Sequence, residues 1–360
     1  MIEFYYDASE LVQTVGALCM LFTTLYVCLV LATRFTRLDT ISSIDFIDPS
    51  TLDPSDLSIT TSDATFHPPV LAQAFKISHA TRYFEFPVLF SRSMDLMLLK
   101  HLAMPSSLLY RALSPAMTDP ATGESTVVDT VVCRLLDAGD LLMRELTERP
   151  LHSNRAWRVL HHMRSCIDAA PELDHSDIIY FLAGCVVEPV RIINMYGWRR
   201  VHQNEVNALL VTWRAIGLHL GVTDMPLTFD ELLVYMEKYE SSKIAYSDTG
   251  KQLFDATLRV WKKCVPPVWA RGLSQLVATV LPVEFRRAVG LANPKVELEM
   301  SVRCALALRA WFVQWLTLAR STAAHRTPPH AASNGRFTPL FQLYDIGSDG
   351  YDIESLGKLK

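Results

Sequence analysis

The stretch Asp174–Arg200, DHSDIIYFLAGCVVEPVRIINMYGWRR, is the longest apolar segment after the N-terminal region, and it decides how the body of the chain folds. Asp174 or Ser176 can cap a helix that begins at Asp177, because a short side-chain oxygen accepts a hydrogen bond from an unpaired backbone N–H group. The residues that follow leave little polar face. The sequence therefore predicts a central helix that is buried on most sides.

A proline and a charged pair lie inside this predicted helix. Pro189 has no backbone N–H group and is expected to kink the helix. Glu188 and Arg191 stand three residues apart and are spaced to pair. Ala183 and Gly184 are small, so they permit close approach by another helix or a flat ligand.

The segments around the central helix also have apolar residues at helical spacing, several with recognisable caps. They cover residues 127–146, 155–168, 204–220, 228–238, 249–263, 272–281, 282–291 and 295–319. Thr228 and Glu231 fit a capping box, and Ser153 or Asn154 can cap the helix that starts at Arg155. Alternating strand patterns with hairpin turns are missing from the sequence, so the predicted fold is all-α.

Composition limits the classes of function. Half of the residues are apolar and the net charge is -4, which allows a large core and gives no reason to expect a nucleic-acid partner. The chain has seven cysteines and no CxxC pair. A disulfide framework is therefore not expected, and the body is predicted to face a reducing compartment.

The N-terminal region contains an uncharged run, LVQTVGALCMLFTTLYVCLVLAT, over residues 11–33. A helix of this length spans roughly 35 Å, enough to cross a bilayer core. Three acidic residues and no basic residue precede the run, whereas Arg34 and Arg37 follow it. This charge pattern predicts a single transmembrane anchor with the rest of the chain in the cytosol; the alternative is a buried core helix.

The expected domain organisation has five parts. These are a lumenal N-terminus over residues 1–10, the transmembrane helix over 11–33, a linker over 34–69, one helical domain over 70–321 and a flexible tail over 322–360. The linker is rich in Ser, Thr, Asp and Pro, and we expect it to be exposed. The tail contains prolines and glycines and ends in polar residues, so we expect it to be poorly ordered.

Common catalytic motifs are missing from the sequence, among them GxSxG, Walker A, GxGxxG and HExxH. Arg134 and Asp137 lie three residues apart on one side of an amphipathic helix, where a surface ion pair is the simpler interpretation. His161 and His162 point about 100° apart on their helix, so at most one can face a given pocket. From residue types alone, a hydrogen-bonded structural histidine is expected more often than a ligand.

An ordered set of short motifs resembles the ER-bound oxygenases of the MpaB type, which are distantly related to the bacterial latex-clearing rubber oxygenases. The motifs are Phe86-Pro87, Ala103-Met104-Pro105, Arg134-Leu135-Leu136-Asp137, Asp177-Ile178-Ile179-Tyr180, Glu188-Pro189-Val190-Arg191, Tyr196-Gly197-Trp198-Arg199, Tyr239-Glu240, Leu281-Pro282 and Arg286-Arg287-Ala288. The resemblance implies a single rubber-oxygenase-like helical domain behind a membrane span, and secondary metabolism at the ER membrane. It also implies oxidative cleavage, with O2, of a carbon–carbon double bond in a terpenoid or meroterpenoid prenyl chain.

The resemblance further implies haem b, held by a histidine, with an Arg-x-x-(Lys/Asp)-Thr helix on its distal side. Arg134 and Asp137 match that helix as catalytic residues, whereas Ala138 replaces the threonine. Counting back from Glu188 without gaps, the position of the iron-binding histidine falls on Arg164, whose guanidinium has no free lone pair. Either His162 or His161 supplies the haem-iron ligand after a small shift, or this chain has lost it.

Three functions are therefore open at this stage. The first is a membrane-anchored oxygenase for a lipophilic substrate. The second is a catalytically inactive relative that binds a lipid or prenyl chain, or scaffolds a pathway at the ER. The third is an oxidoreductase that acts on a lipophilic compound without carbon–carbon cleavage.

Overall fold

The computed structural model describes residues 8–45, 48–59, 68–115, 125–170, 173–344 and 350–357. Within these ranges the regular structure is helical, which confirms the predicted all-α class, and an isolated antiparallel bridge joins Phe337 to Tyr351. The helices of the body are α3 (Pro69–Ala80), α4 (Pro87–Leu102), α5 (Leu108–Leu113), α7 (Ser125–Thr147), α8 (Asn154–Asp168), α9 (His175–Tyr196), α10 (Gln203–His219), α11 (Phe229–Lys243), α12 (Asp248–Cys264), α13 (Pro267–Ala270), α14 (Leu273–Val280), α15 (Val283–Ala288) and α16 (Val296–Leu316).

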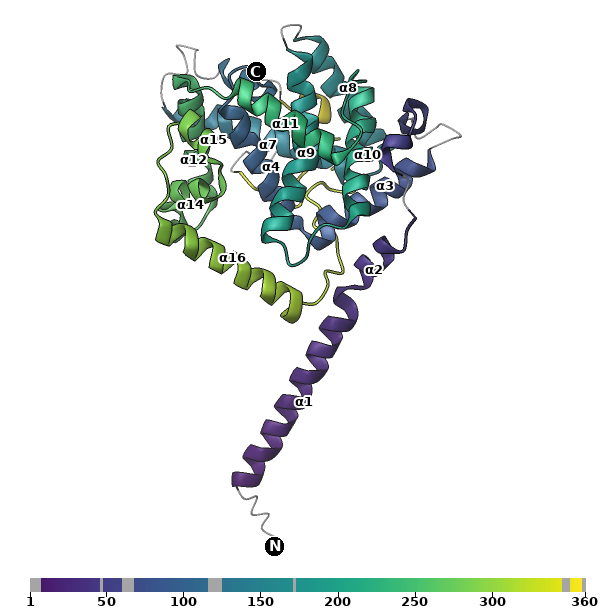
Figure 1. Cartoon of the computed structure of the whole chain (residues 1–360), viewed down its shortest axis with the longest axis vertical. Helices are drawn as coiled ribbons and strands as arrows, with labels where there is room; N and C mark the ends of the chain where they lie inside the picture. Colours follow the sequence, from purple (N-terminus) through teal and green to yellow (C-terminus); the bar gives the residue numbers. More distant parts are fainter. Residues whose placement is uncertain are drawn as a thin grey trace.

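Helix α9 is the centre of the body (Figure 1), as its sequence predicts. Its residues from Asp177 to Val190 are all buried. It contacts α4, α10 and α11 along its length, so its side chains meet other helices on several sides. Pro189 lies within the helix, and Glu188 pairs with Arg191 at 2.7 Å, which confirms the predicted ion pair.

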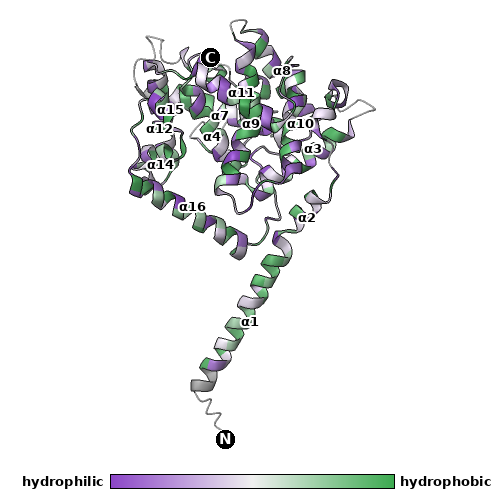
Figure 2. Cartoon of the chain, in the orientation of Figure 1, coloured by the Kyte–Doolittle hydropathy of each residue, from purple (hydrophilic) through white to green (hydrophobic). Residues whose placement is uncertain are grey.

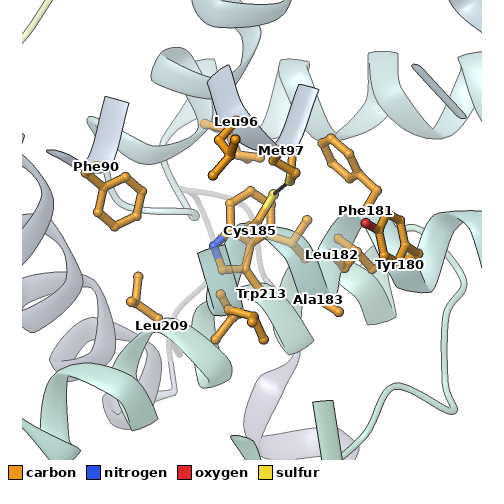
Figure 3. Packing of buried hydrophobic residues seen from close by; sticks show 14 of the residues in the cluster. Phe90, Leu96, Met97, Tyr180, Phe181, Leu182, Ala183, Cys185, Leu209 and Trp213 are labelled. Atoms are coloured by element: carbon orange, nitrogen blue, oxygen red, sulfur yellow. Dashed lines mark hydrogen bonds between the residues drawn. The ribbon is translucent and has the colours of Figure 1, made fainter. Parts of the chain in front are cut away.

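The contact between α4 and α9 is close because one position has no side chain. A Cβ atom on Gly184 would lie 2.7 Å from the Sδ atom of Met97. The thiol of the next residue, Cys185, lies 4.0 Å from the same sulfur atom, and Figure 3 shows both residues beside Trp213 of α10. The small residue at this point lets α4 approach, and the sulfur-containing side chains fill the remaining space.

Polar caps fix where several helices begin. Ser153 accepts a hydrogen bond from the N–H group of Ala156 at the start of α8. Thr228 and Glu231 form the predicted capping box of α11. His202 and Glu205 form another at α10, where the sequence did not suggest one, because an imidazole nitrogen takes the place of the usual hydroxyl or carboxylate.

The segment after the N-terminal helix differs from the exposed linker that we expected. It contains α2 (Thr36–Ser42) and the short 3-10 helices η1 (Pro49–Thr51) and η2 (Pro54–Leu57), which contact α10. Leu57 is fully buried, and the side chain of Asn204 donates to the carbonyl oxygens of Ile41 and Ile44, each at 2.8 Å. The described part of this segment therefore packs against the body.

The described part of the C-terminal segment also differs from the poorly ordered tail that we expected. Arg326 and Thr327 are almost completely buried, and so is Ile353 in the short helix η5 (Ile353–Ser355). The segment lies against α7 and α8. Its polar residues there complete ion pairs and hydrogen bonds of those helices, which explains why a polar sequence is ordered.

Helix α1 (Ala8–Arg34) projects away from the body (Figure 1) and is apolar over most of its length (Figure 2). The described side chains along it are mostly exposed, and the run Val12–Ser42 is long and apolar enough to cross a membrane. Helix α9 is also long and apolar enough to cross a membrane, but 83% of the residues in its most apolar stretch are buried, as in a core helix. At the end of α1, Arg34 lies 4.1 Å above the ring of Trp198.

Candidate active site

The two predicted catalytic residues on α7 have different surroundings. Arg134 is exposed, whereas the carboxylate of Asp137 accepts a hydrogen bond from Arg326. The same guanidinium donates to Asp140 at 2.7 Å. Burial raises the pKa of Asp137 although Arg326 acts against this, so the arginine offsets the cost of placing a carboxylate there. Asp137 therefore binds the C-terminal segment, whereas Arg134 is exposed and takes no part in this contact.

Glu148, the residue directly after α7, also binds the C-terminal segment. Its two carboxylate oxygens accept hydrogen bonds from the backbone N–H groups of Arg326 and Thr327, at 2.8 and 2.9 Å. One residue earlier in the tail, the Nε2 atom of His325 lies 2.7 Å from the Nε2 atom of His79 on α3. These contacts join the tail to α3 and to the residue after α7.

The three predicted cofactor residues on α8 have different surroundings. His162 is buried, and its Nε2–H group donates to the carbonyl oxygen of Leu356 at 2.8 Å. His161 is exposed and lies edge-on to the ring of Trp157, with 4.8 Å between ring centroids. Arg164 pairs with Asp168 at 3.0 Å. The structure therefore does not bring these residues together.

As they lie, these residues do not fit the axial ligand of a haem group. The Nε2 atom of His162 donates its proton to the carbonyl oxygen of Leu356 and has no lone pair for iron, so only Nδ1 of the neutral ring keeps one. Arg164 has no free lone pair, and His161 lies on the exposed side of α8.

A buried polar network joins α4, α9 and α11; Tyr180, Glu188 and Glu240 belong to the motifs quoted above, whereas Lys100 was not singled out by the sequence. The Nζ atom of Lys100 lies 2.7 Å from both Glu188 and Glu240, and Tyr180 donates to Glu240 at 2.9 Å. Burial alone would raise the pKa of Glu188, but Lys100 and Arg191 outweigh it and lower the pKa. The network therefore holds a charged carboxylate inside an apolar core.

His101 lies next to this network and has an unusual environment. It is fully buried, and neither ring nitrogen has a hydrogen-bond partner among the described residues. Its ring lies edge-on to Tyr180, with 5.0 Å between centroids. Burial lowers the pKa of His101 to about 3, so the imidazole is neutral at physiological pH. Its only signal in the sequence is a histidine within the apolar α4 helix, and this pattern is usually structural.

Comparison with known proteins identifies the family. The family model described as "ER-bound oxygenase mpaB/B'/Rubber oxygenase, catalytic domain" matches residues 94–315. The chain is 23% identical to the ER-bound oxygenase mpaB' of Penicillium brevicompactum over 269 residues, which cover 70% of this chain and 61% of that protein. It is 29% identical to mpaB of the same organism over 157 residues, covering 42% and 37% respectively.

The match spans less than two thirds of the length of these curated relatives. Among solved structures, the closed state of latex clearing protein LCP is similar at a TM-score of 0.48 and 16% identity, over 75% of this chain and 73% of that chain. Because the matched residues 94–315 are more than half of the chain, this protein belongs to the family of ER-bound oxygenases mpaB/B' and rubber oxygenases.

Proposed function

We propose that this protein is a membrane-anchored oxygenase that uses O2 to oxidise a lipophilic substrate. The observation that carries the proposal is the match of residues 94–315 to the catalytic domain of an oxygenase family. The finer proposal is oxidative cleavage of a carbon–carbon double bond in the prenyl chain of a terpenoid or meroterpenoid, in secondary metabolism. This finer part rests on the resemblance of the short motifs.

The proposed location is the ER membrane, with one membrane span and the body in the cytosol. Two features support it: the exposed apolar surface of α1, and the description of the curated relatives as ER-bound. Arg34 and Arg37 follow the span on the side of the body, as the positive-inside rule requires for a cytosolic domain. A protein that appears in the supernatant after carbonate extraction of membranes would contradict this proposal.

Haem b is the cofactor that the resemblance implies, and the α8 residues do not fit it as they lie. We therefore assign no catalytic step to haem and no ligand role to His161, His162 or Arg164. The catalytic role of Arg134 and Asp137 stays a prediction. In the structure, Asp137 and Asp140 of α7 bind the side chain of Arg326, and Glu148, just after α7, binds the backbone of the next residue, Thr327.

A second candidate function is an inactive relative that binds a lipid or prenyl chain, or scaffolds a pathway at the ER. The observation that favours it is the engagement of Asp137 and His162 by the C-terminal segment. Ala138, where the motif has a threonine, points the same way. The two candidates differ in whether the chain carries iron and consumes O2.

The test uses the full-length chain purified in detergent. Iron is quantified, an absorption spectrum is recorded, and the protein is incubated with a prenylated phenol and isotopically labelled O2. Oxygenase activity predicts iron near one atom per chain and products that contain the label. Cleaved products support carbon–carbon scission, and a labelled product of intact chain length supports oxidation without cleavage. Absence of both iron and product, with the substrate retained on the protein, supports the binding function.

A further inference from the structure

Helix α16 has an apolar surface that the body does not cover. None of its 21 residues is buried, although its sequence, VELEMSVRCALALRAWFVQWL, carries only two charged residues after its first turn, Arg303 and Arg309. A helix with so few charges normally buries its apolar residues against a core. The main contacts of α16 within the described structure are with α14, α1 and α9, and these leave most of the helix uncovered.

The exposed apolar residues of α16 lie along one side of the helix. The exposed fractions are 62% for Met300, 66% for Leu308, 52% for Trp311, 53% for Phe312 and 38% for Trp315. Spacings of three and four residues from Leu308 to Trp315 place these side chains on one face. Val296 extends this face at the start of the helix and is 68% exposed. We call this set of six residues the α16 face.

The α16 face continues the surface of the proposed membrane span. In Figure 1, α16 runs along the edge of the body from which α1 emerges. The hydroxyl group of Tyr26 donates to the carbonyl oxygen of Leu316 at 3.0 Å. Tyr26 lies eight residues before Arg34, roughly 12 Å from that end of the helix. The end of α16 therefore meets α1 at a level within its apolar run.

A second contact fixes the same arrangement just beyond α16. Arg37 donates to the carbonyl oxygen of Arg320 at 2.5 Å and to Glu85 at 2.8 Å. The chain is therefore attached to the N-terminal helices both within the apolar run and at its basic end. If α1 crosses the bilayer, these two contacts keep the end of α16 at the depth of the lipid headgroups and upper acyl chains.

We propose that the α16 face lies in the cytosolic leaflet and binds phospholipid, so that the body is partly immersed beside its own anchor. This inference rests on the proposed membrane span. Tryptophan at positions 311 and 315 suits the boundary between headgroups and acyl chains, where an aromatic ring with one polar N–H group is stable. Arg303 and Arg309 have side chains long enough to reach phosphate groups from a helix that lies in the plane of the membrane.

The experiment measures tryptophan quenching by phospholipids brominated in the upper acyl chain. The full-length protein is reconstituted into nanodiscs at one chain per disc. The double variant Trp311→Phe, Trp315→Phe is compared with Trp157→Phe, whose residue lies on α8, at the end of the body away from α1 in Figure 1. We expect the double variant to lose most of the lipid-dependent quenching and the α8 variant to retain it.

Equal quenching in the parent and the double variant overturns the proposal, provided that circular dichroism shows both folded. Loss of the lipid-dependent quenching when two chains share one disc would assign the face to a second copy, and this outcome also overturns the proposal. A native thiol gives an independent readout: Cys304 of α16 should react more slowly with a water-soluble maleimide in nanodiscs than Cys166 of α8, although both are exposed in the structure. Equal labelling of the two thiols contradicts the proposal.

The outcome is separable from the proposed function. A protein released by carbonate extraction shows that the anchor is absent, whereas a protein that stays in the membrane but shows no α16 quenching refutes this inference alone. Oxygenase activity does not enter either measurement.

Discussion

His101 is a neutral imidazole in the core whose two ring nitrogens have no partner among the described residues. An unsatisfied buried polar atom costs about 1–3 kcal/mol, whereas an apolar group of similar shape avoids this cost. We therefore expect His101→Phe to raise the free energy of unfolding by about 1 kcal/mol. The same change at His162, which loses the hydrogen bond to Leu356, should lower it. Denaturant unfolding measures both. A less stable His101→Phe protein would show that its nitrogens have a bound partner.

Lys100 is the cation that compensates two carboxylates inside the body. Replacing Lys100 leaves Glu188 and Glu240 without this cation. Breaking a buried ion pair by removing one partner destabilises a protein by about 3–5 kcal/mol. We expect Lys100→Met to be destabilised near the lower end of this range, because Arg191 still binds Glu188. The matched control is Lys251→Met, whose ion pair with Asp255 is about half exposed and contributes about 0.5 kcal/mol or less. Equal melting temperatures for the two variants would contradict this expectation.

The pair formed by His79 and His325 makes stability depend on pH. Burial, and then the neighbouring His325, lowers the pKa of His79 from 6.5 to about 4; Arg82 acts in the same direction, and Glu148 opposes it. Between these pH values the unfolded chain binds a proton that the folded chain does not. The stability contributed by the neutral ring is therefore present above pH 6.5 and is lost as the pH falls toward 4.

The measurement is the melting temperature of the parent, His79→Gln and His330→Gln proteins between pH 7 and pH 4.5. His330 is exposed and serves as the control. We expect the decrease with acid to be smaller in His79→Gln than in the other two proteins. Parallel pH profiles for all three would show that the His79 ring is not responsible.

Among the helices, the sequence predicted those features that depend on residues close together in the chain. The cap at Ser153, the capping box at Thr228 and the buried length of α9 follow from spacing within one or two turns, and the structure has all three. The candidate site could not be predicted in this way. Asp137 binds an arginine 189 residues later and His162 binds a carbonyl group 194 residues later, and no local pattern indicates such partners.

The order of the C-terminal segment depends on Arg326. This side chain is buried and donates to Asp137 and Asp140, so a neutral amide in its place removes the cation of Asp137 and leaves Asp140 with Arg144 alone. We expect Arg326→Gln to loosen the segment from α7 and to speed backbone hydrogen exchange at residues 325–341 and 351–357 by at least about tenfold, the effect of about 1.4 kcal/mol. The control is Arg336→Gln, at an exposed position in the same segment. Unchanged exchange in Arg326→Gln would refute the role of this ion pair.

For the whole molecule, the proposed orientation gives a direct prediction. A tag on the N-terminus should lie in the ER lumen and a tag on the C-terminus in the cytosol, because Arg34 and Arg37 favour the cytosolic side of the span. In intact microsomes, added protease should remove the C-terminal tag and leave the N-terminal tag until detergent is present. The reverse pattern of protection would show that the body faces the lumen.

The contacts of Tyr26 with Leu316 and of Arg37 with Arg320 join residues 290 and 283 positions apart. Translation proceeds from the N-terminus, so α1 leaves the ribosome long before its partners are synthesised. During most of translation the span would therefore sit in the membrane without the residues that hold the body against it. The final position of the body relative to the bilayer is consequently set only after nearly the whole chain has been made.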